Sequence, residues 1–383
     1  MELDAEVSLD PERQRQARRY SSQRRAIALA ELAIAGVYLG GLILAGETNR
    51  LRDAAVGLTG GRVASIALFF LVIWAGYLII SLPLGIVSGW MLPRRYGMSV
   101  QTFGQWCVDW LKGETIAIVI GAAMIEVVYA LLLATPAYWW LVAGVLYLAF
   151  VVGMANLAPI LLLPLFYKLT PLDLPNLEER LETLAREARV RVRGVFRMNL
   201  SAKTTAANAA LMGLGNTRRV VLGDTLLDNY SSDEIAVVFA HELGHHVHGD
   251  VPRLIGTQAV ATVVGLYLAN IALSWGAANL GYRGIADVAD LPLLILILGV
   301  VSAATAPLLN GLSRKMERAA DWYALSLTQM PGAFISTMTR LANQNLAEYQ
   351  PAPWVEVLFY DHPSIANRVR LAQRFAHERG VAQ

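Results

Sequence analysis

The stretch "SSDEIAVVFAHELGHHVHGD" covers residues 231–250 and holds four of the chain's six histidines. It opens with Ser231 and Glu234 at capping-box spacing, where each side chain satisfies a backbone N–H at the start of a helix. An apolar run follows directly. We therefore expect one helix that runs through about His248.

His241, Glu242 and His245 form the pattern His-Glu-x-x-His on that expected helix. Residues four apart share one helix face, so both imidazoles can reach one metal ion. Glu242 lies about 100° around the helix, where its carboxylate can reach a water on the metal without being a ligand. The pattern is typical of helices that bind zinc through two histidines and use the glutamate as general base.

A catalytic zinc ion needs a third protein ligand and an open position for water. Glu317 and Asp321 lie four residues apart in "SRKMERAADWYAL" (313–325), on a helix expected to continue from the last apolar stretch. Glu317 would complete the ligand set, and Asp321 would accept a hydrogen bond from the outer nitrogen of a ligand histidine. The alternative is that Glu317 is a solvated carboxylate paired with Arg314 or Arg318.

The composition places this site in a membrane protein. Hydrophobic residues make up 55% of the 383 residues, and charged residues only 16%, against roughly 25% in soluble proteins. A net charge of +2 gives no reason to expect a nucleic-acid partner. Cys107 is the single cysteine, which excludes an intramolecular disulfide and a cysteine-based zinc ribbon. Any zinc site must therefore use histidine and carboxylate ligands.

Six stretches are long and apolar enough to cross a bilayer. They are 26–46, 63–92, 114–134, 138–166, 252–275 and 290–312. Basic residues concentrate before the first stretch, with six arginines in residues 1–25, and in the loop after the second. Positively charged loops stay in the cytoplasm, so the N-terminus and both large polar segments are expected on the cytoplasmic side, in contact with the lipid bilayer.

This topology predicts a basic cytoplasmic segment, two membrane regions and a protease domain built from two separate segments. Within the first polar segment, 175–190 has helical periodicity, 194–200 and 219–224 are expected strands, and 204–213 is a weaker one. The predicted parts are 1–25 (basic segment), 26–166 (four transmembrane helices), 167–251 (protease domain with the zinc helix), 252–312 (two transmembrane helices) and 313–383 (the rest of the protease domain).

Together with these residues, Asn208-Ala209 upstream and "DHPSIANRVR" (361–370) downstream make four motifs over about residues 165–383. Their order resembles that of the integral-membrane zinc metallopeptidases of the type I CAAX prenyl protease family, to which the bacterial heat-shock membrane proteases are related. The resemblance implies a mainly α, polytopic membrane protein of six to seven spans. It also implies a small α/β gluzincin-like zinc metalloprotease domain on the cytoplasmic side.

The resemblance also assigns roles to residues of this chain and implies one Zn²⁺ per chain. His241, His245 and Glu317 would bind the zinc, and Glu242 would be general base and acid. Asn208 and Ala209 would hold the substrate backbone on an edge strand. His362 would stabilise the oxyanion, and Arg368 would organise that corner. The implied substrates are prenylated CAAX-type peptides, or membrane proteins in quality control.

A zinc endopeptidase acting on a peptide or protein substrate has two competing interpretations. A transporter would show an internal repeat with broken helices, and none stands out. A zinc-binding membrane scaffold or chaperone without proteolytic activity would need a closed four-ligand site, for which no fourth ligand is evident. Glu126, inside the third stretch, is an intramembrane ionisable residue of unassigned role. Asp250 and Arg253 are expected to be interfacial.

Overall fold

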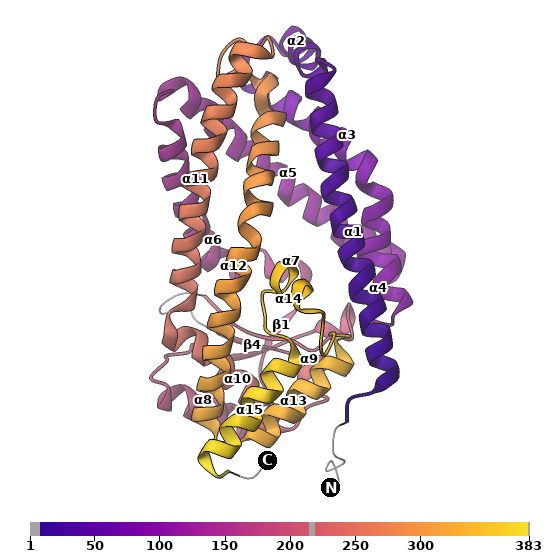
Figure 1. Ribbon diagram of the computed structural model, residues 1–383, viewed down its shortest axis with the longest axis vertical. Coiled ribbons are helices and arrows are strands. Elements are labelled where there is room, and N and C mark those ends of the chain that lie inside the picture. The colour runs from indigo at the N-terminus through magenta and orange to yellow at the C-terminus, as the bar shows by residue number, and fades with distance from the viewer. Residues whose placement is uncertain (1–7, 214–218, 382–383) are drawn as a thin grey trace.

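The computed structural model describes residues 8–213 and 219–381 and is mainly helical (Figure 1). Six of the described helical stretches are long and apolar enough to cross a bilayer, and each overlaps one stretch expected from the sequence. They are α1 (Pro11–Leu44), α3 (Arg62–Ile86) with its continuation through a π-helical turn (Val87–Met91) into α4 (Leu92–Arg95), α5 (Phe103–Ala134), α6 (Trp139–Leu161) with α7 (Leu163–Phe166), α11 (Asp250–Asn279), and α12 (Leu291–Thr328) with the 3₁₀ turn Val288–Asp290 before it.

These helices expose much of their apolar surface, as membrane spans do. In α6, no residue of the most apolar window is buried, and Leu44, Ile79 and Val119 on other spans are more than half exposed. An α-helix satisfies its backbone hydrogen bonds internally, so apolar side chains can face lipid at no polar cost. The segment between the first two spans forms a helix, α2 (Glu47–Thr59).

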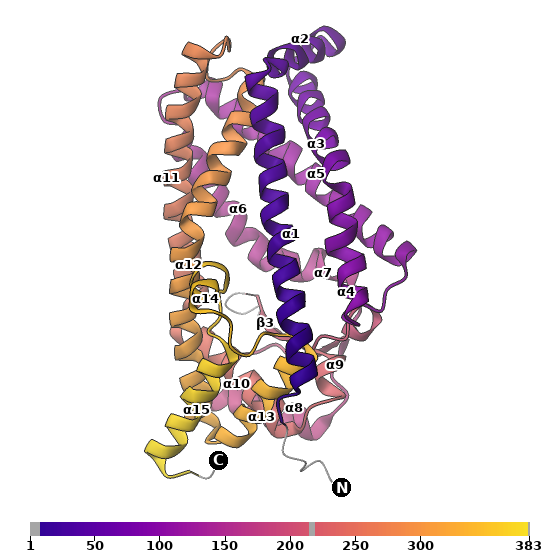
Figure 2. The ribbon, with the colours of Figure 1, turned by 45° about the vertical axis from the view of Figure 1, so that its right-hand side comes forward.

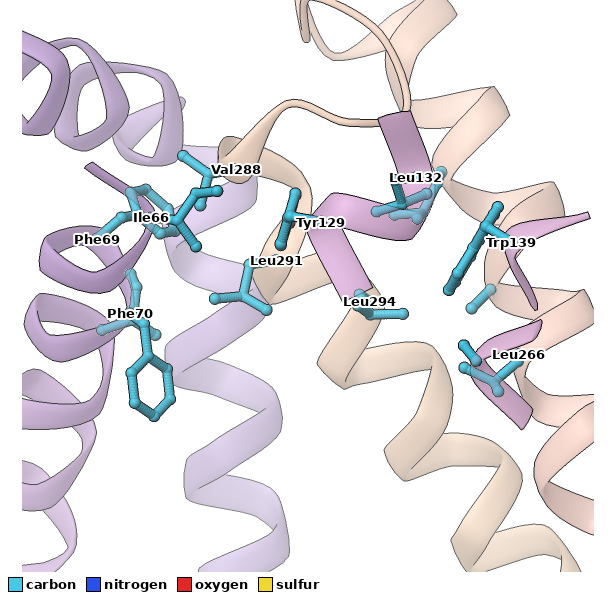
Figure 3. Close-up of a cluster of buried hydrophobic side chains, with 14 of the residues drawn as sticks. Ile66, Phe69, Phe70, Tyr129, Leu132, Trp139, Leu266, Val288, Leu291 and Leu294 are labelled. Carbon is cyan, nitrogen blue, oxygen red and sulfur yellow. The ribbon is translucent and has the colours of Figure 1, made fainter. Parts of the chain in front are cut away.

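Side chains from several spans pack into one apolar cluster at the end of the bundle far from the sheet. Figure 3 shows Tyr129 of α5 and Leu291 of α12 between Phe69 of α3 and Trp139 at the start of α6. All four side chains are at most 1% exposed. The Tyr129 hydroxyl donates a hydrogen bond of 2.5 Å to the buried carboxylate of Asp290, so the cluster also carries a satisfied polar contact.

A four-stranded sheet lies at the other end of the spans. Its strands are β1 (Leu169–Pro171), β2 (Val195–Met198), β3 (Ala209–Met212) and β4 (Arg219–Gly223), in the order β1-β2-β4-β3. β2 and β4 are parallel, whereas β1–β2 and β3–β4 are antiparallel. The weak strand expected at 204–213 is thus limited to four residues. β3 forms one edge of the sheet.

Helix α10 (Ser232–His248) lies between this sheet and α12, and the predicted helix is confirmed. Ser231 and Glu234 form both hydrogen bonds of the capping box. Phe239 and Leu243 pack toward the sheet, and the opposite face packs on the C-terminal helices. The remaining helices of this region are α8 (Pro175–Glu187), a 3₁₀ turn (Leu200–Ala202), α9 (Asp224–Leu227), α13 (Pro331–Gln344), α14 (Pro353–Phe359) and α15 (Ile365–Arg379).

The basic N-terminal residues continue the first span as one helix. α1 begins at Pro11, where Asp10 caps its first turn, and Figure 2 shows its lower end beside the C-terminal helices. The side chain of Gln14 is buried there and bonds the carbonyl of Ala347 (3.2 Å) and the N–H of Tyr349 (2.9 Å). The two ends of the chain therefore hold each other in place.

Candidate active site

Three side chains from two helices converge at one point. The Nε2 atoms of His241 and His245 on α10 lie 3.1 Å apart. Each lies 3.3 Å from a carboxylate oxygen of Glu317 on α12. These donor atoms all fall within 4.8 Å of one another, the separation expected of ligands to one metal ion.

Close packing of α10 on α12 brings the donors together, and Gly244 permits it. A Cβ at Gly244 would lie 3.0 Å from the Cα of Ala320 and 3.2 Å from its carbonyl oxygen. Both are backbone atoms, which cannot move away as a flexible side chain can. The glycine inside the His-Glu-x-x-His segment therefore sets the distance between the histidine helix and the helix that carries Glu317.

The donor chemistry at this point fits zinc. The Nδ1 atom of His241 lies 2.9 Å from Asp321, and the Nδ1 atom of His245 lies 2.9 Å from Asp250. When each Nδ1–H donates to its carboxylate, both Nε2 lone pairs face the carboxylate of Glu317. Such a set needs a cation, and two nitrogen ligands of a tetrahedral zinc lie about 3.3 Å apart. The buried Oε2 of Glu317 also has no hydrogen-bond partner among the described residues.

Protons compete with a metal for these histidines. Burial alone would lower the pKa of His241, but its contacts with Asp321 and Glu317 outweigh burial and raise the pKa to about 9. The pKa of His245 is also raised: burial lowers it, while Glu317 and Asp250 raise it more. A metal ion would take the place of these protons, because a ligand histidine must be neutral at the coordinating nitrogen.

Arg368 supports the site from behind the ligands. Its guanidinium donates two hydrogen bonds to the fully buried Asp321, of 2.9 and 2.5 Å, and lies 3.4 Å from the Nδ1 of His241. A bidentate pair of this kind fixes the orientation of the carboxylate. Arg368 thus reaches His241 mainly through Asp321.

The other residues singled out from the sequence surround the donor set. His362 is 54% exposed at its side chain and places Nε2 3.2 Å from Glu317, while Asp361 holds its Nδ1 at 2.8 Å. Glu242 is half-buried, next to His241 on α10. Asn208 is exposed at the start of β3, and its carbonyl accepts a hydrogen bond from the N–H of Gly223.

Asp250 is the site residue that the sequence interpretation missed. It was expected to be interfacial, but it is 2% exposed and bonds His245. The helix ends at Gly249, whose φ of 67° turns the chain so that the next carboxylate folds back onto the ring. A Gly-Asp pair just past a histidine helix is the sequence signal that would have indicated this contact.

Glu126 stands apart from this cluster. It lies on α5 within a span, and its Oε1 is buried without a hydrogen-bond partner among the described residues. The metal donors come from α10 and α12 instead.

A buried two-histidine, one-glutamate donor set at the end of a bundle of membrane helices defines an integral-membrane metallopeptidase. The sequence profile of peptidase family M48 matches residues 171–376, and that of the CAAX prenyl protease N-terminal region, described as five membrane helices, matches residues 3–168. The chain therefore belongs to peptidase family M48 and is a multi-pass membrane metalloendopeptidase of the CAAX prenyl protease type. Four of the six candidate spans lie in the second range.

Individual proteins agree with this assignment. The chain is 29% identical to a Bacillus subtilis protein described as the uncharacterized metalloprotease YhfN, over 87% of this chain and 79% of that one. It is 27% identical to the CAAX prenyl protease 1 homolog of Oryza sativa subsp. japonica, over 76% and 69%. The crystal structure of S. mikatae Ste24p has the same fold, with a TM-score of 0.83, 22% identity and coverage of 97% and 90%.

Proposed function

We propose that this protein hydrolyses peptide bonds at a zinc ion held by His241, His245 and Glu317, with Glu242 as general base. The observation that carries the proposal is the convergence of the two Nε2 atoms on Glu317, with each Nδ1 bonded to a buried carboxylate. That arrangement fixes both tautomers for metal binding.

Each neighbouring residue has a place in the proposed reaction. A bound zinc ion supplies Lewis acidity, which makes a water nucleophilic near neutral pH. Glu242 takes the proton of that water and later delivers it to the departing amine. His362 lies on the exposed side of Glu317 and donates to the developing oxyanion. Arg368 holds Asp321 and so keeps His241 in position.

The edge of the sheet provides the substrate backbone site. β3 pairs with β4 on one side, and no strand of the described residues pairs with its other side. A peptide can add there as a further strand, bonded to the backbone of Ala209 and to Asn208. We expect the peptide to run antiparallel to β3, as β1 does to β2 and β3 does to β4.

The substrate class in this proposal is apolar: prenylated CAAX-type peptides or membrane protein segments, cut at the cytoplasmic face. A cavity of about 670 Å³ opens between α5, α6, α11 and α12 and is lined mainly by apolar side chains. Its lining reaches Gln258 and Thr305, about 12 Å along α11 from Asp250 and about 18 Å along α12 from Glu317, at 1.5 Å rise per residue. A lipid chain attached near the cut site would reach this cavity.

The proposal is tested with zinc-loaded protein in detergent and its Glu242→Ala variant, each incubated with one complex peptide pool and read by mass spectrometry. New termini with the wild type and none with Glu242→Ala support a metallopeptidase with Glu242 as base. Zinc-loaded protein that makes no cuts, including in vesicles with a membrane-held substrate, favours the scaffold or chaperone alternative. Equal cutting by both proteins contradicts the role of Glu242.

A further inference from the structure

A second cavity, of about 660 Å³, is lined by His362 and by none of the metal donors. Its walls come from residues 20–28 of α1, the segment 341–348 and the segment 359–365. His362 and Arg368 belong to its lining, so the cavity adjoins the catalytic centre. Its volume is in the range of pockets that bind drug-sized ligands, which is room for a few residues of peptide.

The arginines of this cavity are paired with carboxylates, with one exception. Arg368 bonds Asp321, Arg25 lies 3.5 Å from Glu348, and Asp361 holds His362. Arg24, which also lines the cavity, has no carboxylate partner among the described residues. Its guanidinium lies over the ring of Tyr20, 5.7 Å from the centroid. Arg24 is therefore the guanidinium of this cavity that has no carboxylate partner among the described residues.

The strand edge directs one end of a substrate toward this cavity. Asn345 lines the cavity and makes two hydrogen bonds to Ala207, the residue before Asn208. Its Oδ1 accepts from the N–H of Ala207 (2.8 Å), and its Nδ2 donates to the carbonyl of Ala207 (3.0 Å). A peptide that adds antiparallel to β3 runs toward Ala207 as it runs toward its own C-terminus. Its C-terminal residues thus arrive at the cavity that Asn345, His362 and Arg24 line.

We propose that this cavity receives the residues on the C-terminal side of the cut, and that Arg24 binds the free carboxylate of the substrate's C-terminus. The inference rests on the proposed function, because it places the cut at the zinc site. Guanidinium and carboxylate match in charge and in planar geometry, which gives the strongest hydrogen bonds between side chains and ligands. The partner is a peptide C-terminus, and an anionic lipid headgroup is the competing occupant.

The test measures binding, so that it does not depend on turnover. A fluorescein-labelled short Leu/Ala peptide is made with a free C-terminal carboxylate and as its C-terminal amide. Both are titrated, in neutral detergent, into zinc-loaded Glu242→Ala protein and into the same protein with Arg24→Gln, Arg24→Lys or Arg19→Gln. Arg19 is an exposed arginine of α1 outside the cavity lining and controls for the loss of one positive charge.

We expect the free acid to bind about tenfold more tightly than the amide. The ratio should fall to near one with Arg24→Gln, recover in part with Arg24→Lys, and persist with Arg19→Gln. Equal binding of acid and amide by the Glu242→Ala protein overturns the inference. It is overturned as well if Arg19→Gln lowers the preference for the acid as much as Arg24→Gln does. It is also overturned if phosphatidylglycerol vesicles displace the peptide through Arg24 while the peptide's own carboxylate has no effect.

The two proposals fail separately in these experiments. A preference for the acid that depends on Arg24, in a protein that never cuts peptides, leaves the cavity assignment standing and refutes the peptidase. Cutting that depends on Glu242, with no preference between acid and amide, leaves the peptidase standing and refutes the carboxylate site.

Discussion

Two carboxylates hold the two histidines, and they differ in what else depends on them. Asp250 bonds His245, and its other ion-pair partner among the described residues is the exposed Arg253, whereas Asp321 also neutralises the largely buried Arg368. We expect Asp250→Asn to weaken zinc affinity about 10- to 100-fold with little loss of stability. Asp321→Asn should add a loss of about 3–5 kcal/mol in stability, because it leaves Arg368 buried without a counter-charge.

Zinc titration against a competing chelator, followed by thermal unfolding, separates these two effects. The double variant Asp321→Asn/Arg368→Leu is the control, because it also removes the unpaired guanidinium of Arg368. It should recover part of the stability without restoring zinc affinity. Equal unfolding temperatures for Asp250→Asn and Asp321→Asn would contradict the assigned difference.

The raised pKa of His241 makes metal binding depend on pH. In the metal-free protein the protons on the coordinating nitrogens of His241 and His245, whose pKa values are both raised, must leave before zinc binds. Apparent zinc affinity should therefore rise about tenfold or more per pH unit toward pH 9 and then level off. Without metal, the stabilisation from protonated His241 is complete below its ordinary pKa of 6.5 and disappears as the pH rises through about 9. Metal titrations across this range, with a chelator corrected for its own pH dependence, check the slope. A flat profile would contradict it.

At the residue scale, local pattern predicted the donors because a helix fixes which residues share a face. His241 and His245 needed only their spacing. The bond between Asp250 and His245 depended on a left-handed Gly249, and the Arg368–Asp321 pair joins residues 47 positions apart. A single sequence gives no distance between such residues, so the family resemblance could suggest a role for Arg368 but not its contact with Asp321, and the role of Asp250 was missed.

At the element scale, the approach of α10 to α12 sets the geometry of the metal site. Gly244→Ala would push the two helices apart by a few tenths of an ångström, because its Cβ meets backbone atoms of Ala320. Overpacking of this kind costs about 1–3 kcal/mol, and we expect zinc affinity to fall with stability. Gly256→Ala is the matched control: Gly256 is helical, and its Cβ would meet nothing within 4 Å. Similar losses of zinc affinity and stability in Gly244→Ala and Gly256→Ala would show a general effect of replacing a helical glycine and would contradict this prediction.

The intramembrane cavity gives the test of substrate class. Ala261→Phe places a ring in the lining of the cavity, whereas Ala304→Phe adds the same bulk at an exposed position of α12 outside that lining. We expect Ala261→Phe to raise the KM of a farnesylated peptide several-fold and to leave the KM of the same peptide without the lipid unchanged, because only the lipid needs that volume. Equal effects on both peptides would place the lipid elsewhere.

Helices were more predictable than strands in this chain. The capping box at Ser231 and the apolar runs of the spans are local signals, so α10 and all six long helices could be expected from sequence. β1 is only three residues long and was not expected, and β3 is shorter than the strand expected at 204–213. Strands this short depend on pairing with distant segments, as β2 does with β4.

At the scale of the whole molecule, the catalytic region is assembled from both ends of the chain. Arg13 of α1 bonds the carbonyl of Asn343 (3.0 Å), and Gln14 bonds the segment beyond it. The same segment clamps Ala207 through Asn345, next to the proposed substrate edge. The N-terminal helix thus supports the strand edge through one intermediate segment, although its basic residues alone suggested only a contact with lipid.

This assembly requires both ends of the chain and the sheet to lie on one side of the membrane, and we propose from the basic residues that this side is the cytoplasm. The single cysteine makes a direct measurement possible: in a Cys107→Ser background, Ala278→Cys and Glu182→Cys each introduce one exposed thiol, in the last turn of α11 and on α8. In intact bacterial cells without an outer membrane, a membrane-impermeant maleimide should label Ala278→Cys at once and Glu182→Cys only after lysis. The opposite pattern would place the site outside, where the apolar substrates would have to arrive from the other leaflet.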